Sequence, residues 1–274
     1  VMPDARRPLD DLGRRPRSGP HRTAGGHLHR LHLLSSLRVG HARPHLVMAT
    51  PHVHRVMRTA RWWSLDPTPE FAHGGVLYVL HGYGQLAEYF IRKFQVQCDA
   101  GWRVVAPEGA HRFYLKGTDG RIGASWMTRE ARLDDIHDYV GTMDSLRDEI
   151  DPERRGHQAL LGFSQGVATA LRWAALGHHG PASWDTLIAH SGVIPPDLKA
   201  MDGELNKAPD LHLVRGTEDP YVADPEGRFK TAEASWREAG GRTSGLHLHA
   251  FDGGHHIDPP TIKRLLQEHV NLEG

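Results

Sequence analysis

The sequence predicts an α/β protein in which helices cover both faces of a doubly wound, mostly parallel sheet. Three observations lead to this fold class. Short apolar runs alternate with helix-like segments, the inner runs are apolar along their whole length, and 274 residues are enough for one sizeable core. A strand that is covered on both faces is apolar throughout, whereas a half-exposed strand alternates. We therefore expect one compact domain over residues 48–274.

Seven segments have the length and composition of β-strands. They are residues 53–62, 76–80, 103–106, 158–162, 186–190, 212–215 and 246–251. Helices are expected between them, and two can be placed directly. In residues 133–150 apolar side chains recur at helical spacing and an Asp-Pro pair follows, while residues 165–175 are good helix formers with an apolar face. This alternation is typical of a parallel sheet.

Residues 1–47 differ in charge from the rest of the chain. They hold nine arginines, no lysine and three aspartates, a net +6, whereas the other 24 basic and 30 acidic residues give −6. We expect this segment to be a disordered basic tail, or mis-assigned upstream sequence, with the working protein beginning at Met48. A transit peptide, a basic arm for nucleic acid and a secretory signal are the alternatives.

The composition limits the classes of binding partner and the cellular compartment that we expect for this protein. Lys plus Arg and Asp plus Glu both number 33, so the overall charge does not indicate nucleic acid or an anionic membrane as a partner. Cys98 is the single cysteine, which excludes an internal disulfide and favours a reducing, cytoplasmic location. No run approaches the roughly 18 apolar residues of a membrane helix. We expect no membrane span and a small neutral molecule as partner; the oligomeric state is not predicted.

Residues 160–166, Leu-Leu-Gly-Phe-Ser-Gln-Gly, carry the strongest chemical signal. A short apolar run leads into Gly162-x-Ser164-x-Gly166, a pattern that places a serine on a sharp turn between a strand and a helix. Glycine at both flanking positions removes Cβ atoms where the chain doubles back. Ser164 would then lie at a helix N-terminus, where free N–H groups stabilise negative charge. The pattern predicts a nucleophile elbow; the alternative is a plain turn with an exposed serine.

A nucleophilic serine needs an imidazole to accept its proton and a carboxylate to orient that imidazole. In doubly wound hydrolases the acid and then the histidine follow the serine along the chain, each at the C-terminal end of a later strand. Asp219, in a turn after the sixth predicted strand, is the candidate acid, with Asp224 and Glu218 as alternatives. His255, in a glycine-containing loop after the last strand, is the candidate base, with His256 as the alternative.

Acyl transfer also needs hydrogen-bond donors for the oxyanion. One donor is normally the N–H of the residue after the nucleophile, and another lies in the loop after an early strand. These rules select the backbone N–H groups of Gln165 and Tyr83, the latter within His-Gly-Tyr-Gly. His81, at the start of that segment, is expected to brace the loop by hydrogen bonding.

The chain has 22 histidines, several of them adjacent or alternating. These are His52 and His54, His178 and His179, and His247 and His249. No carboxylate or thiolate pattern in the sequence accompanies a pair to complete a metal site. We therefore expect neither a metal nor another cofactor.

Four motifs occur in order: Leu-His-Gly-Tyr-Gly, Gly-Phe-Ser-Gln-Gly, Gly-Thr-Glu-Asp-Pro-Tyr-Val and Gly-Gly-His-His-Ile. With them, the chain from residue 76 onward resembles the phospholipase/carboxylesterase branch of the α/β-hydrolase family. The resemblance implies the α/β-hydrolase fold and a catalytic triad of Ser164, Asp219 and His255. It also implies oxyanion donors at Tyr83 and Gln165.

The same resemblance bears on residues 123–130, which stand where related enzymes carry a serine-tryptophan segment beside the acyl pocket. It implies that Trp126 and Met127 line the substrate site, with Arg129 and Glu130 at its rim. A tryptophan near a helix start is as often ordinary core, and that alternative stays open.

The function expected from these residues is that of a cofactor-free serine hydrolase that cleaves carboxylic esters through an acyl-enzyme. No long insertion indicates a large lid, which favours small or medium acyl groups. Acyl-protein thioesterase or lysophospholipase-like activity is the nearest alternative. A different class of alternative is a non-catalytic binding protein of the same fold.

Overall fold

The computed structural model describes residues 49–72, 75–154, 156–200, 204–221 and 225–270. The chain divides into two units, Val1–Arg55 and Val56–Gly274, and the helices and strands that are described belong to the second. The tail predicted for residues 1–47 lies outside the described residues, so it stays a prediction.

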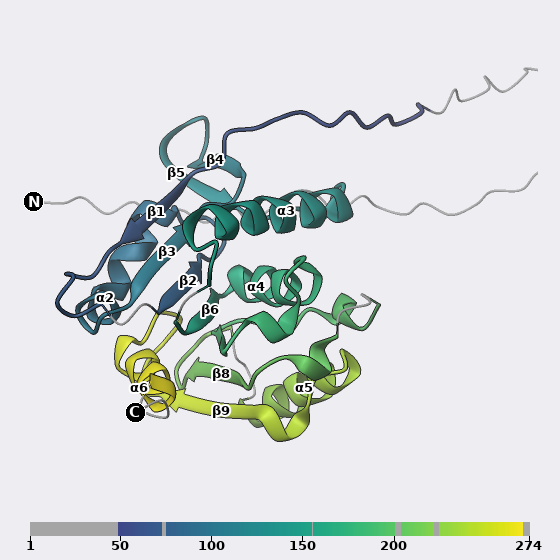
Figure 1. Cartoon of the computed structure of the whole chain (residues 1–274). Coiled ribbons are helices and arrows are strands. Elements are labelled where there is room, and N and C mark those ends of the chain that lie inside the picture. Colours follow the sequence, from purple (N-terminus) through teal and green to yellow (C-terminus); the bar gives the residue numbers. More distant parts are fainter. Residues whose placement is uncertain (1–48, 73–74, 155, 201–203, 222–224, 271–274) are drawn as a thin grey trace, which may run out of the picture. The chain divides into compact units, whose positions relative to one another are not determined.

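Seven strands form the central sheet, in the order β1, β3, β2, β6, β7, β8, β9 (Figure 1). Their bounds are β1 (Trp62–Leu65), β2 (Val76–Leu80), β3 (Arg103–Pro107), β6 (Gln158–Phe163), β7 (Thr186–His190), β8 (Leu211–Gly216) and β9 (Leu246–Phe251). β1 pairs antiparallel with β3, and the other neighbouring strands pair in parallel. The inner strands β2, β6, β7 and β8 are buried along their whole length. The predicted sheet is therefore confirmed.

Helices cover both faces of this sheet. They are α1 (Ala87–Phe90), α2 (Gln95–Asp99), α3 (Arg132–Ile150), α4 (Gln165–Leu176), α5 (Pro225–Glu238) and α6 (Pro259–Val270), and a short 3₁₀ turn (Ile91–Phe94) joins α1 to α2. The apolar side chains of α3, α4 and α5 share one hydrophobic core with one face of the sheet, and those of α1, α2 and α6 share a second core with the other face (Figure 1). The two helices predicted from the sequence correspond to α3 and α4.

The first predicted strand is wrong over most of its length. Residues 53–61 form no strand and are exposed, and β1 begins only at Trp62. Trp62 pairs with Pro107, the last residue of β3, so the chain before Trp62 has no strand beside it to continue the ladder. Alternating apolar residues alone could not reveal that the neighbouring strand ends there.

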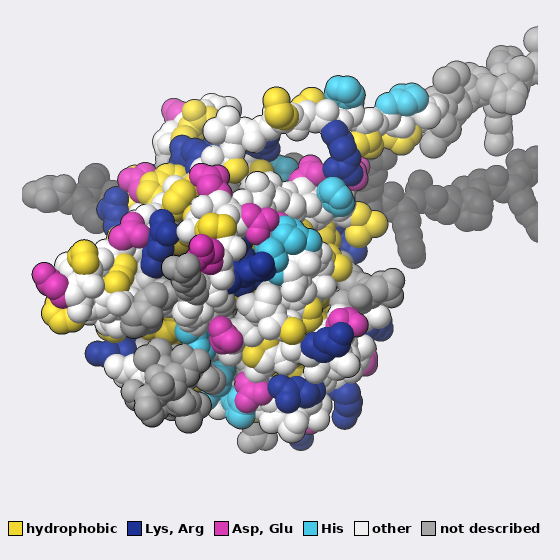
Figure 2. All heavy atoms as spheres, viewed as in Figure 1, with side chains coloured by type: hydrophobic (Ala, Val, Ile, Leu, Met, Phe, Trp, Pro, Cys, Tyr) yellow, Lys and Arg dark blue, Asp and Glu magenta, His cyan; other side chains and the backbone are white. Residues whose placement is uncertain are grey.

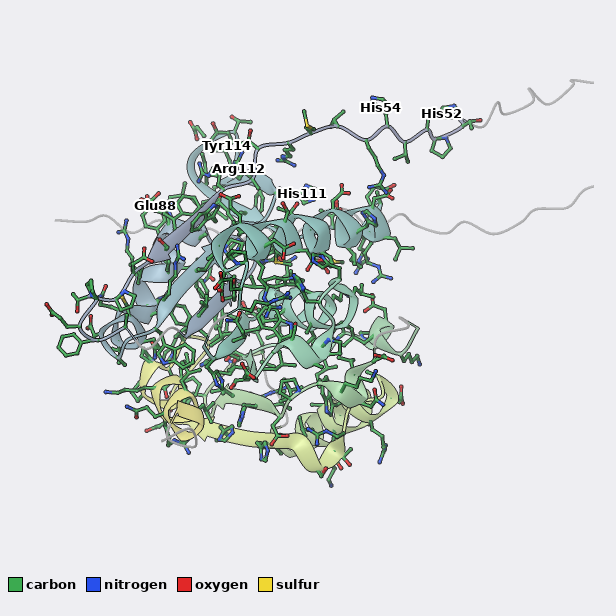
Figure 3. The ribbon with its side chains drawn as sticks, viewed as in Figure 1. His52, His54, Glu88, His111, Arg112 and Tyr114 are labelled. Atoms are coloured by element: carbon green, nitrogen blue, oxygen red, sulfur yellow. The ribbon has the colours of Figure 1, made fainter. Side chains whose placement is uncertain are left out.

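A two-stranded hairpin, β4 (His111–Lys116) and β5 (Asp119–Ser125), was not predicted. Its strands are largely exposed and rich in charged residues, so they lack the apolar run or strict alternation that indicates a strand. Figure 3 labels His111, Arg112 and Tyr114 along β4. The hairpin contacts the loop after β2, because the Gly84 N–H donates to Ala124 O at 2.8 Å and the Ala124 N–H donates to Gln85 O at 3.0 Å.

Acidic, basic and histidine side chains are interspersed over the face of the molecule seen in Figure 2. Among the described residues, no helix combines the length and the apolar composition that crossing a membrane requires.

Candidate active site

Ser164 lies between β6 and α4 in a backbone conformation that is uncommon for a residue with a side chain, with φ 54° and ψ −116°. The chain doubles back so tightly that a Cβ on Gly162 would lie 2.3 Å from Gly166 O, and one on Gly166 would lie 2.2 Å from Leu80 O. The Ser164 N–H donates to His190 O at 2.9 Å. The sharp turn expected from Gly-x-Ser-x-Gly is therefore present.

A hydrogen-bonded series connects three residues that the sequence analysis selected. His255 Nε2 lies 3.1 Å from Ser164 Oγ, and His255 Nδ1 lies 2.8 Å from Asp219 Oδ2. Because an ionised carboxylate only accepts, Asp219 holds the proton of His255 on Nδ1 and leaves the Nε2 lone pair facing the serine hydroxyl. This arrangement can accept a proton from Ser164.

The loops after β8 and β9 bring Asp219 and His255 together. The Thr217 N–H donates to Phe251 O at 2.9 Å, and the Glu218 N–H donates to Gly253 O at 2.8 Å. Asp219 is 3% exposed, and its second oxygen accepts the Tyr221 N–H at 3.0 Å. The buried carboxylate thus has a donor on each oxygen, which lowers the cost of keeping its charge.

Of the alternatives for acid and base, the two that the structure describes, Glu218 and His256, form no side-chain hydrogen bond with Ser164 or His255. Glu218 is exposed, and Asp224 lies outside the described residues. His256 is also exposed, and its ring contacts Phe251, with 5.3 Å between the ring centroids.

The loop after β2 lies beside Ser164, since a Cβ on Gly82 would be 3.2 Å from the Ser164 Cβ. Within this loop the Gly82 N–H donates to Gln85 Oε1 at 2.9 Å and the Gln85 N–H donates to Gly82 O at 3.2 Å. The Tyr83 N–H has no acceptor among the described residues. Gln165 is the first residue of α4, so its N–H has no helical acceptor four residues earlier.

His81 has the bracing contacts expected from the sequence. It is fully buried, its Nδ1 donates to Gly82 O at 2.8 Å, and its Nε2 accepts the Gly109 N–H at 3.0 Å. Burial lowers the pKa of His81 to about 4. Both nitrogens of a neutral ring are therefore used by backbone groups.

Trp126 lies in the hydrophobic core, which is the alternative that the sequence left open. It is 3% exposed, stacks on His81 with 4.8 Å between ring centroids, and donates its indole N–H to His81 O at 2.8 Å. Met127 is partly buried, and its carbonyl accepts from Gln165 Nε2 at 3.3 Å. Trp126 therefore supports the loop that carries Tyr83, and substrate contact by either residue stays a prediction. Arg129 and Glu130 are exposed.

Two residues near the site were missed by the sequence analysis. The Tyr221 ring packs edge-on against His255, with 4.6 Å between centroids. The His190 carbonyl accepts the Ser164 N–H of the elbow, and His190 Nε2 accepts the Asp258 N–H at 3.2 Å. His190 therefore connects the elbow to the loop after His255. Burial lowers the pKa of His190 to about 3. Tyr221 could have been found from its position two residues after Asp219, whereas nothing in the sequence marked His190.

The histidine pairs differ in their surroundings. His247 Nε2 lies 2.8 Å from Asp210 Oδ2, and His249 Nε2 lies 3.1 Å from His212 Nδ1. Asp148 of α3 lies within ligand distance of both His178 and His179, so the fold supplies a carboxylate that the sequence pattern did not reveal. The sequence could not show this, since about 30 residues separate the helix position from the histidines.

The sequence matches no protein-family model and no curated protein. Solved structures do match. The esterase PE8 is 25% identical with a TM-score of 0.58, over 77% of this chain and 99% of that chain. Acyl-protein thioesterase 2 of Zea mays is 18% identical with a TM-score of 0.60, over 79% and 100% of the two chains. A carboxylesterase of Mesorhizobium loti is 15% identical with a TM-score of 0.54, over 73% of this chain and 90% of that chain. These neighbours are α/β-hydrolases of the carboxylesterase type, which confirms the resemblance and the fold class expected from the sequence.

Proposed function

Because the chain has the α/β-hydrolase fold of the esterases that it resembles, we propose that it is a serine hydrolase of carboxylic esters with small or medium acyl groups. In this reaction Ser164 Oγ attacks the ester carbonyl while His255 Nε2 takes its proton. His255 then protonates the leaving alcohol, and an acyl-enzyme forms. Water, deprotonated by His255, attacks the acyl-enzyme and releases the acid.

The hydrogen-bonded series Ser164, His255 and Asp219 is the observation that carries the proposal. Asp219 stabilises the imidazolium that forms as His255 takes the proton. The N–H groups of Tyr83 and Gln165 are the proposed donors to the oxyanion, because both lie beside Ser164 and the described residues offer neither an acceptor. The position of Gln165 at the start of the 12-residue helix α4 adds the positive end of the helix dipole.

A thioesterase activity is the second candidate function. A structural neighbour is named an acyl-protein thioesterase, and the same residues would attack a thioester carbonyl. A cytoplasmic location stays a prediction from the cysteine content.

Hydrolysis of p-nitrophenyl acetate, butyrate and octanoate, with a matching set of acyl thioesters, tests the proposal. We expect saturable ester hydrolysis by the native chain and a fall of about 10⁴-fold or more in kcat for Ser164→Ala. Ser64→Ala, which removes a hydroxyl from the edge strand β1, serves as the control and keeps full activity. Faster turnover of the thioesters would favour the second candidate, and full ester hydrolysis by Ser164→Ala would contradict the mechanism.

A folded protein that hydrolyses neither class of substrate would instead support a non-catalytic binding protein. Circular dichroism and thermal unfolding of the same sample decide whether the protein is folded.

A further inference from the structure

Four side chains meet where α3 passes the connection from α4 to β7. Asp144 and Asp148 lie one turn apart on α3, and His178 and His179 follow Gly177, the C-cap residue of α4. Asp148 Oδ1 lies 2.7 Å from His179 Nε2, and Asp148 Oδ2 lies 3.2 Å from His178 Nε2. One carboxylate thus faces two imidazoles, and the ligand atoms of Asp148, His178 and His179 all lie within 4.8 Å of one another.

The remaining ring nitrogen of His178 is held by Asp144. Nδ1 lies 3.1 Å from Asp144 Oδ2, and the same oxygen accepts the His178 backbone N–H at 2.9 Å. Asp144 is buried, and its other oxygen accepts the Trp173 indole N–H at 2.8 Å. A buried carboxylate that accepts the second ring N–H is the usual partner of a metal-binding histidine, because it fixes the tautomer and the ring orientation.

This contact has a consequence for the other side of the ring. If Nδ1 carries the proton, Nε2 of a neutral His178 is an acceptor, and it faces an oxygen of Asp148 that is also an acceptor. A divalent cation between these two acceptors, which lie 3.2 Å apart, would interact with both and would also engage His179.

His179 Nε2 faces the other oxygen of Asp148 at 2.7 Å, so an ion bound to this carboxylate would lie within reach of both imidazoles. The nearby cation is Arg154, whose guanidinium contacts His179 Nδ1. If His179 Nε2 bound a metal, Nδ1 would keep its proton, and the exposed Arg154 side chain would have to move away.

We propose that Asp148, His178 and His179 bind a divalent transition-metal ion of the zinc type, with Asp144 orienting His178. Two imidazoles and one carboxylate are a ligand set that zinc accepts, and they leave a position for water. The 12 residues of α4, which span about 18 Å, separate these histidines from Ser164. The ion would therefore cross-link α3 to the α4–β7 connection and stabilise the fold, without a part in ester hydrolysis.

Zinc titration of the full-length chain, purified without a polyhistidine tag and stripped with a chelator, tests the proposal. We expect calorimetry to give one zinc ion per chain and thermal unfolding to shift upward with zinc. Asp148→Asn and His179→Asn should each weaken binding at least about tenfold. Arg154→Ala should tighten it, because the repulsive cation and its contact with Nδ1 are gone.

His111→Asn is the matched control. His111 also pairs with an aspartate of α3, Asp135 at 3.0 Å, but it belongs to no cluster of three possible metal ligands in the part of the chain that the structure describes, so zinc binding should be unchanged (Figure 3). Absence of zinc binding to the native chain would overturn the proposal. Binding that persists unchanged in both Asp148→Asn and His179→Asn would also overturn it. Neither result depends on whether the protein hydrolyses esters.

Discussion

Asp219 is the residue whose role can be separated most cleanly from binding and folding. Both of its carboxylate oxygens accept hydrogen bonds, one from His255 and one from the Tyr221 backbone. An asparagine at this position keeps the size of the side chain, but its NH₂ group can take the place of the oxygen that faces His255 and favour the wrong tautomer.

We therefore predict that Asp219→Asn lowers kcat for ester hydrolysis by about 10³–10⁴-fold with little change in KM. The adjacent exposed carboxylate gives the control, and Glu218→Gln should keep the native kcat. Steady-state kinetics on p-nitrophenyl butyrate measures both. Equal activity of the two variants would show that Asp219 does not orient the base.

Two buried histidines make stability depend on pH. The pKa of His190 is lowered to about 3 and that of His81 to about 4, in both cases mainly by burial. Below the ordinary histidine value of about 6.5 the unfolded chain takes up protons at both positions, whereas the native chain does not. Full stability is therefore present above that pH, and it is lost as the pH falls toward the folded-state values.

Each of these histidines should lower the free energy of unfolding by about 1.4 kcal/mol per pH unit below about 6.5. His190→Gln removes one titrating group and keeps an acceptor for the Asp258 N–H. We predict a shallower fall in the free energy of unfolding for this variant, measured by urea unfolding from neutral pH down to about pH 4, the folded-state pKa of His81. An unchanged slope would mean that His190 is already protonated in the native protein.

The β4–β5 hairpin contacts the loop that carries Tyr83, one of the proposed oxyanion donors. It pairs with the loop after β2 through Gly84 and Gln85, the two residues that follow Tyr83. The approach is tight, because a Cβ on Gly123 would lie 2.4 Å from Gly84 O. The position of the hairpin and that of the loop therefore depend on each other.

Gly123→Ala should displace this loop by roughly 1 Å and lower kcat by about 100-fold. Gly141→Ala is a control of the same chemistry, since its Cβ would meet nothing within 4 Å on the exposed side of α3. That variant should keep full activity and gain up to about 1 kcal/mol in stability from helix propensity. Kinetics and thermal unfolding of both variants measure these effects, and native kcat in Gly123→Ala would show that the loop tolerates the shift.

How far the sequence predicted these elements depended on burial. The inner strands and the helices α3 and α4 were placed to within about a residue, because their apolar patterns arise from contacts that every such element makes. The hairpin was missed, since its strands are largely exposed and lack the apolar pattern by which the inner strands were predicted. Ser164, Asp219 and His255 were predicted from the order of the motifs along the sequence. His190 and Asp148, in contrast, are brought to their partners only by the fold.

At the scale of the whole molecule, the net charges of the two parts of the sequence are opposite, +6 for residues 1–47 and −6 for the remainder. The described helices and strands all belong to the unit Val56–Gly274. The sheet, its two cores and the candidate active site are formed by described residues of that unit.

Removing residues 1–47 should leave kcat and the unfolding temperature of the remaining chain unchanged. Parallel kinetics and thermal unfolding of the full and shortened chains test this. A loss of folding or of most activity on removal would mean that the basic segment is a working part of the protein.

The central claim is that Ser164 is an activated nucleophile, and covalent labelling tests it most directly. The native chain is incubated with a fluorophosphonate probe beside Ser164→Ala and His255→Ala, and the modified residue is mapped by mass spectrometry. The account predicts a single label on Ser164 in the native chain and none at that position in either variant, because the hydroxyl reacts only when His255 accepts its proton. A folded native chain that takes up no label, or equal labelling of Ser164 in His255→Ala, would contradict it.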